Sequence, residues 1–99
     1  MVPLEIPIVM AWNVYVMRSR KNGVFYTGVT NDLRKRFTQH KSGKSAYTKG
    51  RGPWEIIYNE MCLDEDDARA REKYLKSGMG KRYLKNRLKR FLSLTGWSR

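Results

Sequence analysis

Cysteine and histidine are almost absent from this sequence, because each occurs once, as Cys62 and His40. A single cysteine forms no disulfide within the chain, and one cysteine with one histidine is too few for a zinc site. These absences exclude a disulfide framework and a structural zinc fold. We therefore expect a protein of a reducing compartment, in the cytoplasm.

Long hydrophobic runs are missing too. The most apolar stretch is residues 1–11, MVPLEIPIVMA, which has no basic start and contains Pro3 and Pro7. It is therefore predicted to be neither a signal peptide nor a membrane span. We expect an extended N-terminal arm or an edge strand there, and no association with a membrane.

Acidic residues are few: nine Asp and Glu stand against 21 Lys and Arg, which gives a net charge of +12 at pH 7. Such a charge attracts polyanions by electrostatic steering and counterion release. Nucleic acid is therefore the expected partner. Charge alone favours a solubility charge or a ribosomal-type basic surface over a catalytic site, and it specifies no reaction.

The length of 99 residues fits one domain, because two halves would each be too small for a core. Hydrophobic residues make up 40% and aromatic residues 12%, enough for a globular fold. The sequence contains neither an internal repeat nor a linker. We predict a domain over residues 12–92, with an arm at 1–11 and a tail at 93–99.

Two runs, WNVYVMR and VFYTGV, alternate between two faces with the period of a strand. The Asn-Gly turn signal between them predicts a β-hairpin. A two-residue turn, or a four-residue loop over residues 20–23, places Tyr15 and Tyr26 on the same face, whereas a three-residue loop separates them. We predict the shared face, where Gly28 leaves space for a ligand to approach the backbone.

The next stretch, TNDLRKRFTQHKSGK, predicts a helix over about residues 32–42, with either Asn31 or Asp32 as the cap. On its helical wheel Arg36 and His40 lie beside the apolar pair Leu33 and Phe37, so they border the core. Spacing alone favours an ordinary solvated helix edge for this pair. Tyrosines in strands are likewise most often half-buried packing residues.

The remaining segments are a cationic loop (SAYTKGRGPW), a strand (EIIYNEM) and two helices. The first helix is predicted over residues 65–76, with Asp64 as its cap. The second, GKRYLKNRLKRFLSL, is predicted as one amphipathic helix with Leu84, Leu88 and Phe91 on its apolar stripe. The order β-β-α-β-α-α predicts an α/β (α+β) fold, a small three-stranded antiparallel sheet flanked by helices.

Glu72 is unusual because it falls between Ala68 and Leu75 on the apolar stripe of its predicted helix. A carboxylate in that position costs several kcal/mol unless it is paired or holds a cation. A salt bridge to a neighbouring arginine and a metal site are about equally favoured.

Phosphodiester hydrolysis needs a positioned water, a base, a cation for the phosphoryl oxygens and protection of the leaving alkoxide. The set that can supply these parts is Tyr15, Tyr26, Arg36, His40 and Glu72. One Mg²⁺ or Mn²⁺ can be held through a single carboxylate because such ions keep most of their waters. A tyrosine beside a cation is expected to have a lowered pKa and to act as a base.

These segments together resemble the GIY-YIG endonuclease superfamily, in particular its small stand-alone bacterial members and the N-terminal nuclease domain of the excinuclease. The resemblance rests on VYV, YTG, TNDLRKRFTQH, GRGPWEIIYNE and REKYLKSG, and runs from about Trp12 to Phe91. Asn13 and Val14 stand where the first motif has glycine and isoleucine. Val29 stands where repair-type nucleases often have a lysine.

The resemblance implies a site on the sheet face with one divalent metal, Mg²⁺ or Mn²⁺, and DNA as substrate. It implies that Tyr15 activates the water, that Tyr26 lies near the phosphate, and that Arg36 binds the phosphate. It also implies an acid-base or orienting role for His40 and a metal-ligand role for Glu72, with Gly28 as the motif glycine.

Two functions follow as expectations. The first is a metal-dependent endonuclease that nicks DNA structures in repair or recombination and leaves a 3′-hydroxyl and a 5′-phosphate, as the resemblance implies. The alternative is a non-catalytic DNA- or RNA-binding module that keeps the nuclease fold. In both, exposed cations are expected to contact phosphates: Lys49, Arg51, Arg82, Lys85 and Lys89.

Overall fold

The structure is a computed structural model that describes residues 11–96, so the arm predicted at residues 1–11 lies almost wholly outside it. The elements are β1 (Trp12–Ser19), β2 (Phe25–Thr30), α1 (Leu33–Lys41), β3 (Trp54–Cys62), α2 (Glu65–Lys76), α3 (Gly78–Arg87) and α4 (Lys89–Leu94). The predicted three-stranded antiparallel sheet and the element order are confirmed, with one additional short helix at the end.

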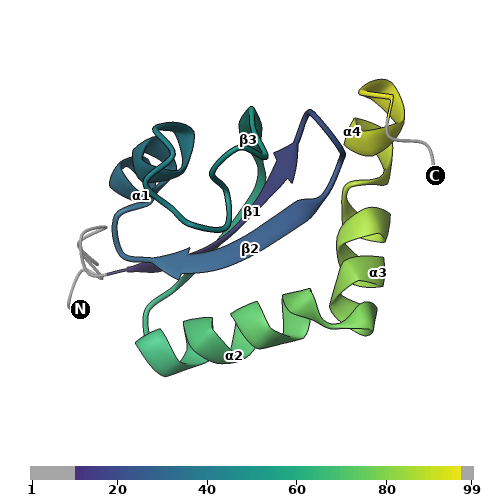
Figure 1. Cartoon of the computed structure of the whole chain (residues 1–99). Helices are drawn as coiled ribbons and strands as arrows, with labels where there is room; N and C mark the ends of the chain where they lie inside the picture. The colour runs from purple at the N-terminus through teal and green to yellow at the C-terminus, as the bar shows by residue number, and fades with distance from the viewer. Residues whose placement is uncertain (1–10, 97–99) are drawn as a thin grey trace, which may run out of the picture.

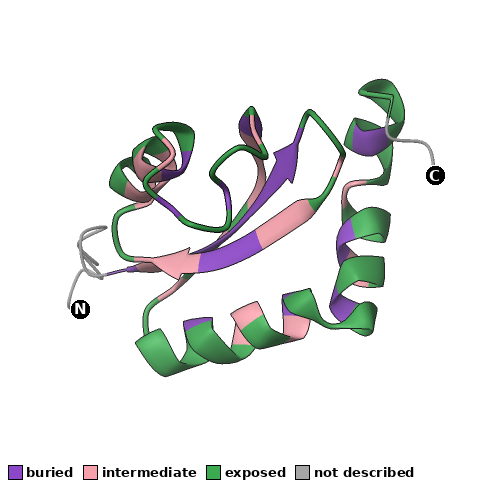
Figure 2. Cartoon of the chain, in the orientation of Figure 1, coloured by how far each residue is buried: buried purple, intermediate pink, exposed green. Residues whose placement is uncertain are grey.

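The sheet has the order β2-β1-β3, with both pairings antiparallel. The central strand β1 is buried along most of its length (Figure 2). Because β2 is an edge strand, it is hydrogen-bonded to a neighbouring strand on one side only. This position of β2 matters for the functional site.

The hairpin register follows from a four-residue loop over residues 20–23. Tyr15 lies opposite Gly28 and Met17 lies opposite Tyr26, and the amide of Ser19 donates to the carbonyl of Val24 at 2.9 Å. Directly opposed residues of antiparallel strands point to the same face. The prediction that Tyr15 and Tyr26 share a face is confirmed.

Each face of the sheet carries its own core, and helices cover both faces (Figure 1). Val14 and Val16 point to the face covered by α2 and α3, where Ala68, Leu75 and Leu84 are buried. Tyr15 and Met17 point to the opposite face, where they pack with Trp54 at the start of β3 and with Leu33 and Phe37 of α1. The face of the sheet that carries Tyr15 is therefore packed against α1, separately from the face that α2 and α3 cover.

The two helices that border the site begin as the sequence predicts. The carboxylate of Asp32 accepts from the amide of Lys35, and that of Asp64 accepts from the amide of Asp67. Such side-chain caps satisfy amides that have no partner within the helix. At the corner between α2 and α3 only a glycine fits, because a Cβ on Gly80 would lie 2.0 Å from the Tyr74 carbonyl oxygen.

The prediction of a single helix after Gly78 is wrong. The helix stops at Leu88, and α4 begins in a new direction at Lys89. Leu92 is buried in place of Phe91, which is 38% exposed. The bend brings α4 against the hairpin end, where the guanidinium of Arg18 donates to the Thr95 hydroxyl at 2.9 Å and lies 5.3 Å from the Phe91 ring.

Among the helices that the structure describes, none has the length and apolar character needed to cross a bilayer.

Candidate active site

Tyr15 and His40 are joined by a hydrogen bond between β1 and α1. The distance from Tyr15 Oη to His40 Nε2 is 2.8 Å, and both side chains are buried. On the other side of the ring, His40 Nδ1 lies 2.9 Å from Thr48 Oγ1, and the Thr48 hydroxyl has the Ser45 carbonyl as its acceptor. This chain of hydrogen bonds assigns the proton to Nδ1, so Nε2 accepts from the Tyr15 phenol.

His40 is a neutral base in this environment. Burial, and next the nearby charge of Arg36, lower the pKa of His40 to about 4. The imidazole is therefore uncharged at pH 7 and is free to receive a proton at Nε2. The sequence pattern favoured a solvated helix edge for this residue, and the structure buries it instead, because Tyr15 and Thr48 supply partners for both ring nitrogens.

Tyr26 lies between the Tyr15–His40 pair and an aromatic cluster. Its ring centroid is 4.9 Å from that of His40 and 6.2 Å from that of Tyr15. On its other side it is 5.3 Å from Tyr47 and 6.3 Å from Trp54. Two phenols and an imidazole therefore meet at one place on the sheet face.

Arg36 supplies the positive charge of this group. It lies one turn before His40 on α1. Burial lowers its pKa, but hydrogen bonds to Tyr15 and Tyr26 outweigh burial, so the pKa of the guanidinium is raised overall. Its Nη1 also donates to Gln39 Oε1 at 3.0 Å. A guanidinium among phenols is suited to neutralise an anionic phosphate.

The expectation for the Tyr15 phenol itself is wrong in direction. Burial, and next the neighbouring Tyr26, raise the pKa of Tyr15 to about 12, although Arg36 opposes the shift. The phenol therefore remains protonated at neutral pH. It is suited to pass a proton on to His40, because it is not ionised to a phenolate before the reaction.

Gly28 has a different role from the expected one. A Cβ built at Gly28 would lie 2.5 Å from Tyr15 Oη and 2.7 Å from Tyr15 Cζ. The space left by the missing side chain is therefore filled by the Tyr15 phenol. The glycine sets the position of the catalytic candidate, and the expectation that it clears room for a ligand is corrected.

Glu72 lies on the flank of α2 that faces the β2 edge. Its neighbour Arg71 turns toward β3 and binds both oxygens of Glu60. Glu72 turns the other way and pairs with Lys76 at 3.0 Å and with Arg69 at 3.9 Å. Lys76 in turn lines a pocket together with Tyr26 of β2. The structure thus brings Tyr15, Tyr26, Arg36 and His40 together on one face of the sheet, whereas Glu72 lies on α2, which covers the other face. The pocket that Lys76 and Tyr26 both line connects the two at the β2 edge.

The donor set at Glu72 fits a single hard cation. Its side chain is 18% exposed, while its partners Lys76 and Arg69 are more than half exposed and are held only by pairs within the helix. Such pairs contribute a few tenths of a kcal/mol, so a divalent ion can displace them. Residues 11–96 contain no group of three or more His, Cys, Asp or Glu side chains suited to a metal. Mg²⁺ bound by one carboxylate and waters needs none.

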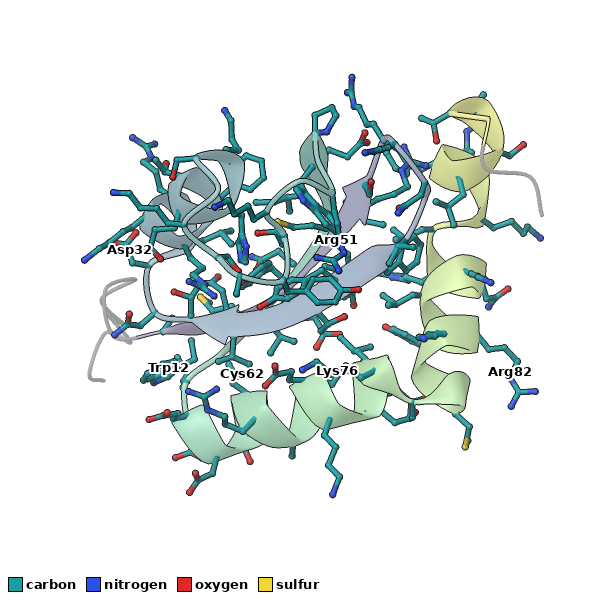
Figure 3. All side chains as sticks on the ribbon, viewed as in Figure 1. Trp12, Asp32, Arg51, Cys62, Lys76 and Arg82 are labelled. Atoms are coloured by element: carbon teal, nitrogen blue, oxygen red, sulfur yellow. The ribbon has the colours of Figure 1, made fainter. Side chains whose placement is uncertain are left out.

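The predicted phosphate-binding cations divide into two groups. Arg51 lies above the sheet (Figure 3), and its guanidinium is 4.8 Å from the Tyr47 ring, so it belongs to the site. Arg82 points away from the sheet on the outer side of α3 (Figure 3). Three further predicted cations are exposed: Lys49 in the loop before β3, Lys85 on α3 and Lys89 at the start of α4.

Sequence reasoning missed several residues at the site. Thr48 and Trp54 hold the loop, because the Trp54 indole donates to the Thr48 carbonyl at 3.1 Å and Thr48 holds His40. Three others line the pocket at β2: Tyr47, Lys76 and Lys81. An aromatic residue inside a cationic loop was the available signal for Tyr47. No periodic pattern separates Lys81 from Arg82.

The shifted pKa of His40 predicts a pH-dependent stability. Between pH 6.5 and 4 the unfolded chain binds a proton at His40 and the folded chain does not, so stability falls as the pH falls. We expect a loss of about 1 to 2 kcal/mol in the free energy of unfolding from pH 6.5 to 5. Urea titrations at both pH values measure it, and His40→Gln should remove the difference. An equal dependence in both proteins would contradict the assignment.

Comparison with known proteins identifies the family. The GIY-YIG catalytic domain matches residues 11–89 of this chain. A UPF0213 protein of Oceanobacillus iheyensis is 41% identical over 64 residues, which are 64% of this chain and 73% of that protein. A UPF0213 protein of Vibrio campbellii is 43% identical over 60 residues, which are 60% of this chain and 55% of that protein.

A solved structure is also similar. The solution NMR structure of a UPF0213 protein from Bacillus halodurans is 33% identical and has a TM-score of 0.49; the match covers 76% of this chain and 82% of that chain. The family match covers most of the chain and includes both hairpin tyrosines, the α1 pair and Glu72. The chain therefore belongs to the GIY-YIG family of nuclease-type catalytic domains.

Proposed function

We propose that this chain is a divalent-metal-dependent endonuclease that hydrolyses phosphodiester bonds in DNA, by nicking DNA structures in repair or recombination. One observation carries the proposal: the Tyr15–His40 hydrogen bond of 2.8 Å lies beside Tyr26 and under the charge of Arg36. A buried chain of proton donors and acceptors next to a cation is costly to maintain for packing alone.

Proton transfer is assigned to Tyr15 and His40. The attacking water gives its proton to Tyr15 Oη as the phenol gives its own proton to His40 Nε2, which is neutral at pH 7. Arg36 binds the phosphoryl oxygens, and the Tyr26 hydroxyl orients the phosphate. The P–O3′ bond breaks, O3′ takes a proton from solvent, and the products are a 3′-hydroxyl and a 5′-phosphate.

Glu72 is the proposed metal ligand. When bound at this carboxylate, Mg²⁺ or Mn²⁺ would supply positive charge for the phosphoryl and leaving oxygens. The chain contributes the Glu72 carboxylate. Its ion pairs with Lys76 and Arg69 must break for an ion to bind there. Substrate phosphates are natural competitors for these two cations.

A cleavage screen tests the proposal. The substrates are duplex, single-stranded, flapped and branched DNA of one sequence, incubated with Mg²⁺, with Mn²⁺ and with EDTA. We expect nicking of at least one substrate with a metal, and none with EDTA. Absence of turnover with either metal on every substrate would contradict the endonuclease.

The alternative is a non-catalytic module that binds DNA or RNA. The ion pairs of Glu72 with Lys76 and Arg69 are the observation that favours it, because a structural acid needs no further partner. It predicts binding with a steep salt dependence, in which each phosphate contact adds about 0.9 to the slope of log affinity against log salt. Comparing the affinity for RNA with that for DNA of the same sequence distinguishes an RNA-binding module from a DNA-binding one.

A further inference from the structure

A pocket opens beside the proposed site, at the free edge of β2. Its volume is about 280 Å³. Phe25, Leu75 and Leu84 form an apolar floor from three different elements. A volume of about 280 Å³ is below the range of pockets that hold drug-sized ligands. It suits a single flat ring system with its sugar.

One wall of the pocket is aromatic. Tyr26 and Tyr47 line it, with their ring centroids 5.3 Å apart and tilted by 37°. Tyr47 is 46% exposed, which is high for a tyrosine in contact with three other side chains. Arg51 lies 4.8 Å from the Tyr47 ring and so fixes its orientation. Arg51 covers one face of the Tyr47 ring, and the part of the ring that stays exposed offers a surface on which a nucleobase stacks.

Part of the lining is cationic. Lys76 at the end of α2 and Lys81 on α3 line the same pocket as the two tyrosines. Figure 3 shows Lys76 on the side of α2 that faces β2. Ammonium groups and aromatic rings in one lining match a ligand that combines a flat ring with a phosphate. A purely apolar ligand would use neither ammonium group, whereas a phosphate at Lys76 would compete with the Glu72 carboxylate, which lies 3.0 Å away.

The pocket and the proposed active site share Tyr26. Its ring is 4.9 Å from His40 on one side, and it forms part of the pocket wall on the other. A nucleic-acid strand whose phosphate lies at Arg36 therefore has its adjoining nucleotide at the pocket. A base stacked inside a duplex cannot enter a pocket between β2, α2 and α3, whereas an unpaired base can.

We propose that this pocket binds one unpaired nucleotide adjacent to the scissile phosphate, so that the enzyme selects DNA with a single-stranded nucleotide at the cut. The base stacks on Tyr47, and the phosphate of that nucleotide contacts Lys81 and Lys76. The inference rests on the proposed function and names the substrate class of the same site.

A binding experiment without turnover tests the pocket. The probes are two DNA duplexes that differ only in one 2-aminopurine, which is unpaired in a one-nucleotide flap or paired within the helix. With Ca²⁺ in place of Mg²⁺, we expect the flap to bind about 10-fold more tightly and its fluorescence to fall on stacking. Tyr47→Ala should remove most of this preference, and Tyr47→Phe should keep it.

A matched pair of variants distinguishes contacts made by the pocket lysines from attraction by the overall positive charge of the protein. Lys81→Gln should weaken binding of the flap more than binding of the duplex, whereas Lys85→Gln on the same helix should weaken both equally. Equal affinity of the wild type for both probes, or an unchanged preference in Tyr47→Ala, would overturn the pocket. Absence of cleavage with intact flap preference would count against the endonuclease and leave the pocket standing.

Discussion

Replacing Tyr15 by phenylalanine should lower the rate of metal-dependent cleavage by a factor of about 10²–10⁴, the usual contribution of a positioned acid or base. The substitution removes only the hydroxyl that connects the water to His40 Nε2. The ring still packs against Met17 and Trp54, so the sheet face keeps its shape. Single-turnover cleavage of the best substrate at saturating metal measures the effect.

Two controls isolate the hydroxyl. Loss of this group leaves His40 Nε2 without its partner and is expected to cost about 1–3 kcal/mol of stability, so thermal unfolding must show that the variant is folded at the assay temperature. Tyr74→Phe removes a hydroxyl from the other face of the sheet and should cleave at the parent rate. A Tyr15→Phe variant as fast as the parent would exclude the proposed proton path.

Replacing Glu72 by glutamine should nearly abolish cleavage, by a factor of about 10²–10⁴ or more, while DNA affinity stays within about twofold. Loss of the carboxylate removes the proposed metal ligand, and metal-ion stabilisation of the transition state is worth several kcal/mol. Titration with Mn²⁺ by calorimetry or electron paramagnetic resonance gives a second readout, in which binding of the ion should disappear.

Lys76 provides the opposite test of the same carboxylate. In the free protein its ammonium group lies 3.0 Å from Glu72 Oε2 and competes with a metal. Lys76→Gln should therefore tighten Mn²⁺ binding about twofold, the effect of losing one helical ion pair. Lys73→Gln, on the same helix and exposed, should leave it unchanged. Metal binding that survives in Glu72→Gln would place the ion elsewhere.

The parts of the fold that depend on local patterns could be predicted. Alternation of apolar and polar residues placed Val14 on one face of β1 and Tyr15 on the other, and the loop length kept Tyr26 beside Tyr15. Asp32 and Asp64 cap their helices as expected. These features are readable because each depends on residues within a few positions in the chain.

The break at Leu88 was not readable, because the leucines on both sides continue a helical period. The segment after the break packs against Arg18, some 70 residues earlier, whose guanidinium lies against Phe91 and donates to the Thr95 hydroxyl. A local pattern carries no information about such a distant partner. The predicted stripe is therefore right at Leu84, which is buried, and wrong at Phe91, whose place Leu92 takes.

The sequence by itself determined which groups are available to the site: two phenols on one face of the hairpin, and an arginine and a histidine one turn apart on the next helix. Only the tertiary structure decided their burial, their hydrogen-bond and ion-pair partners, and their pKa values. It filled the space beside Gly28 with the Tyr15 ring, buried His40 between Tyr15 and Thr48, and set Glu72 beside Lys76 at the edge of β2. The reason is that periodicity fixes the direction of a side chain, whereas pKa, pairing and cavities depend on atoms that distant segments bring within a few ångströms.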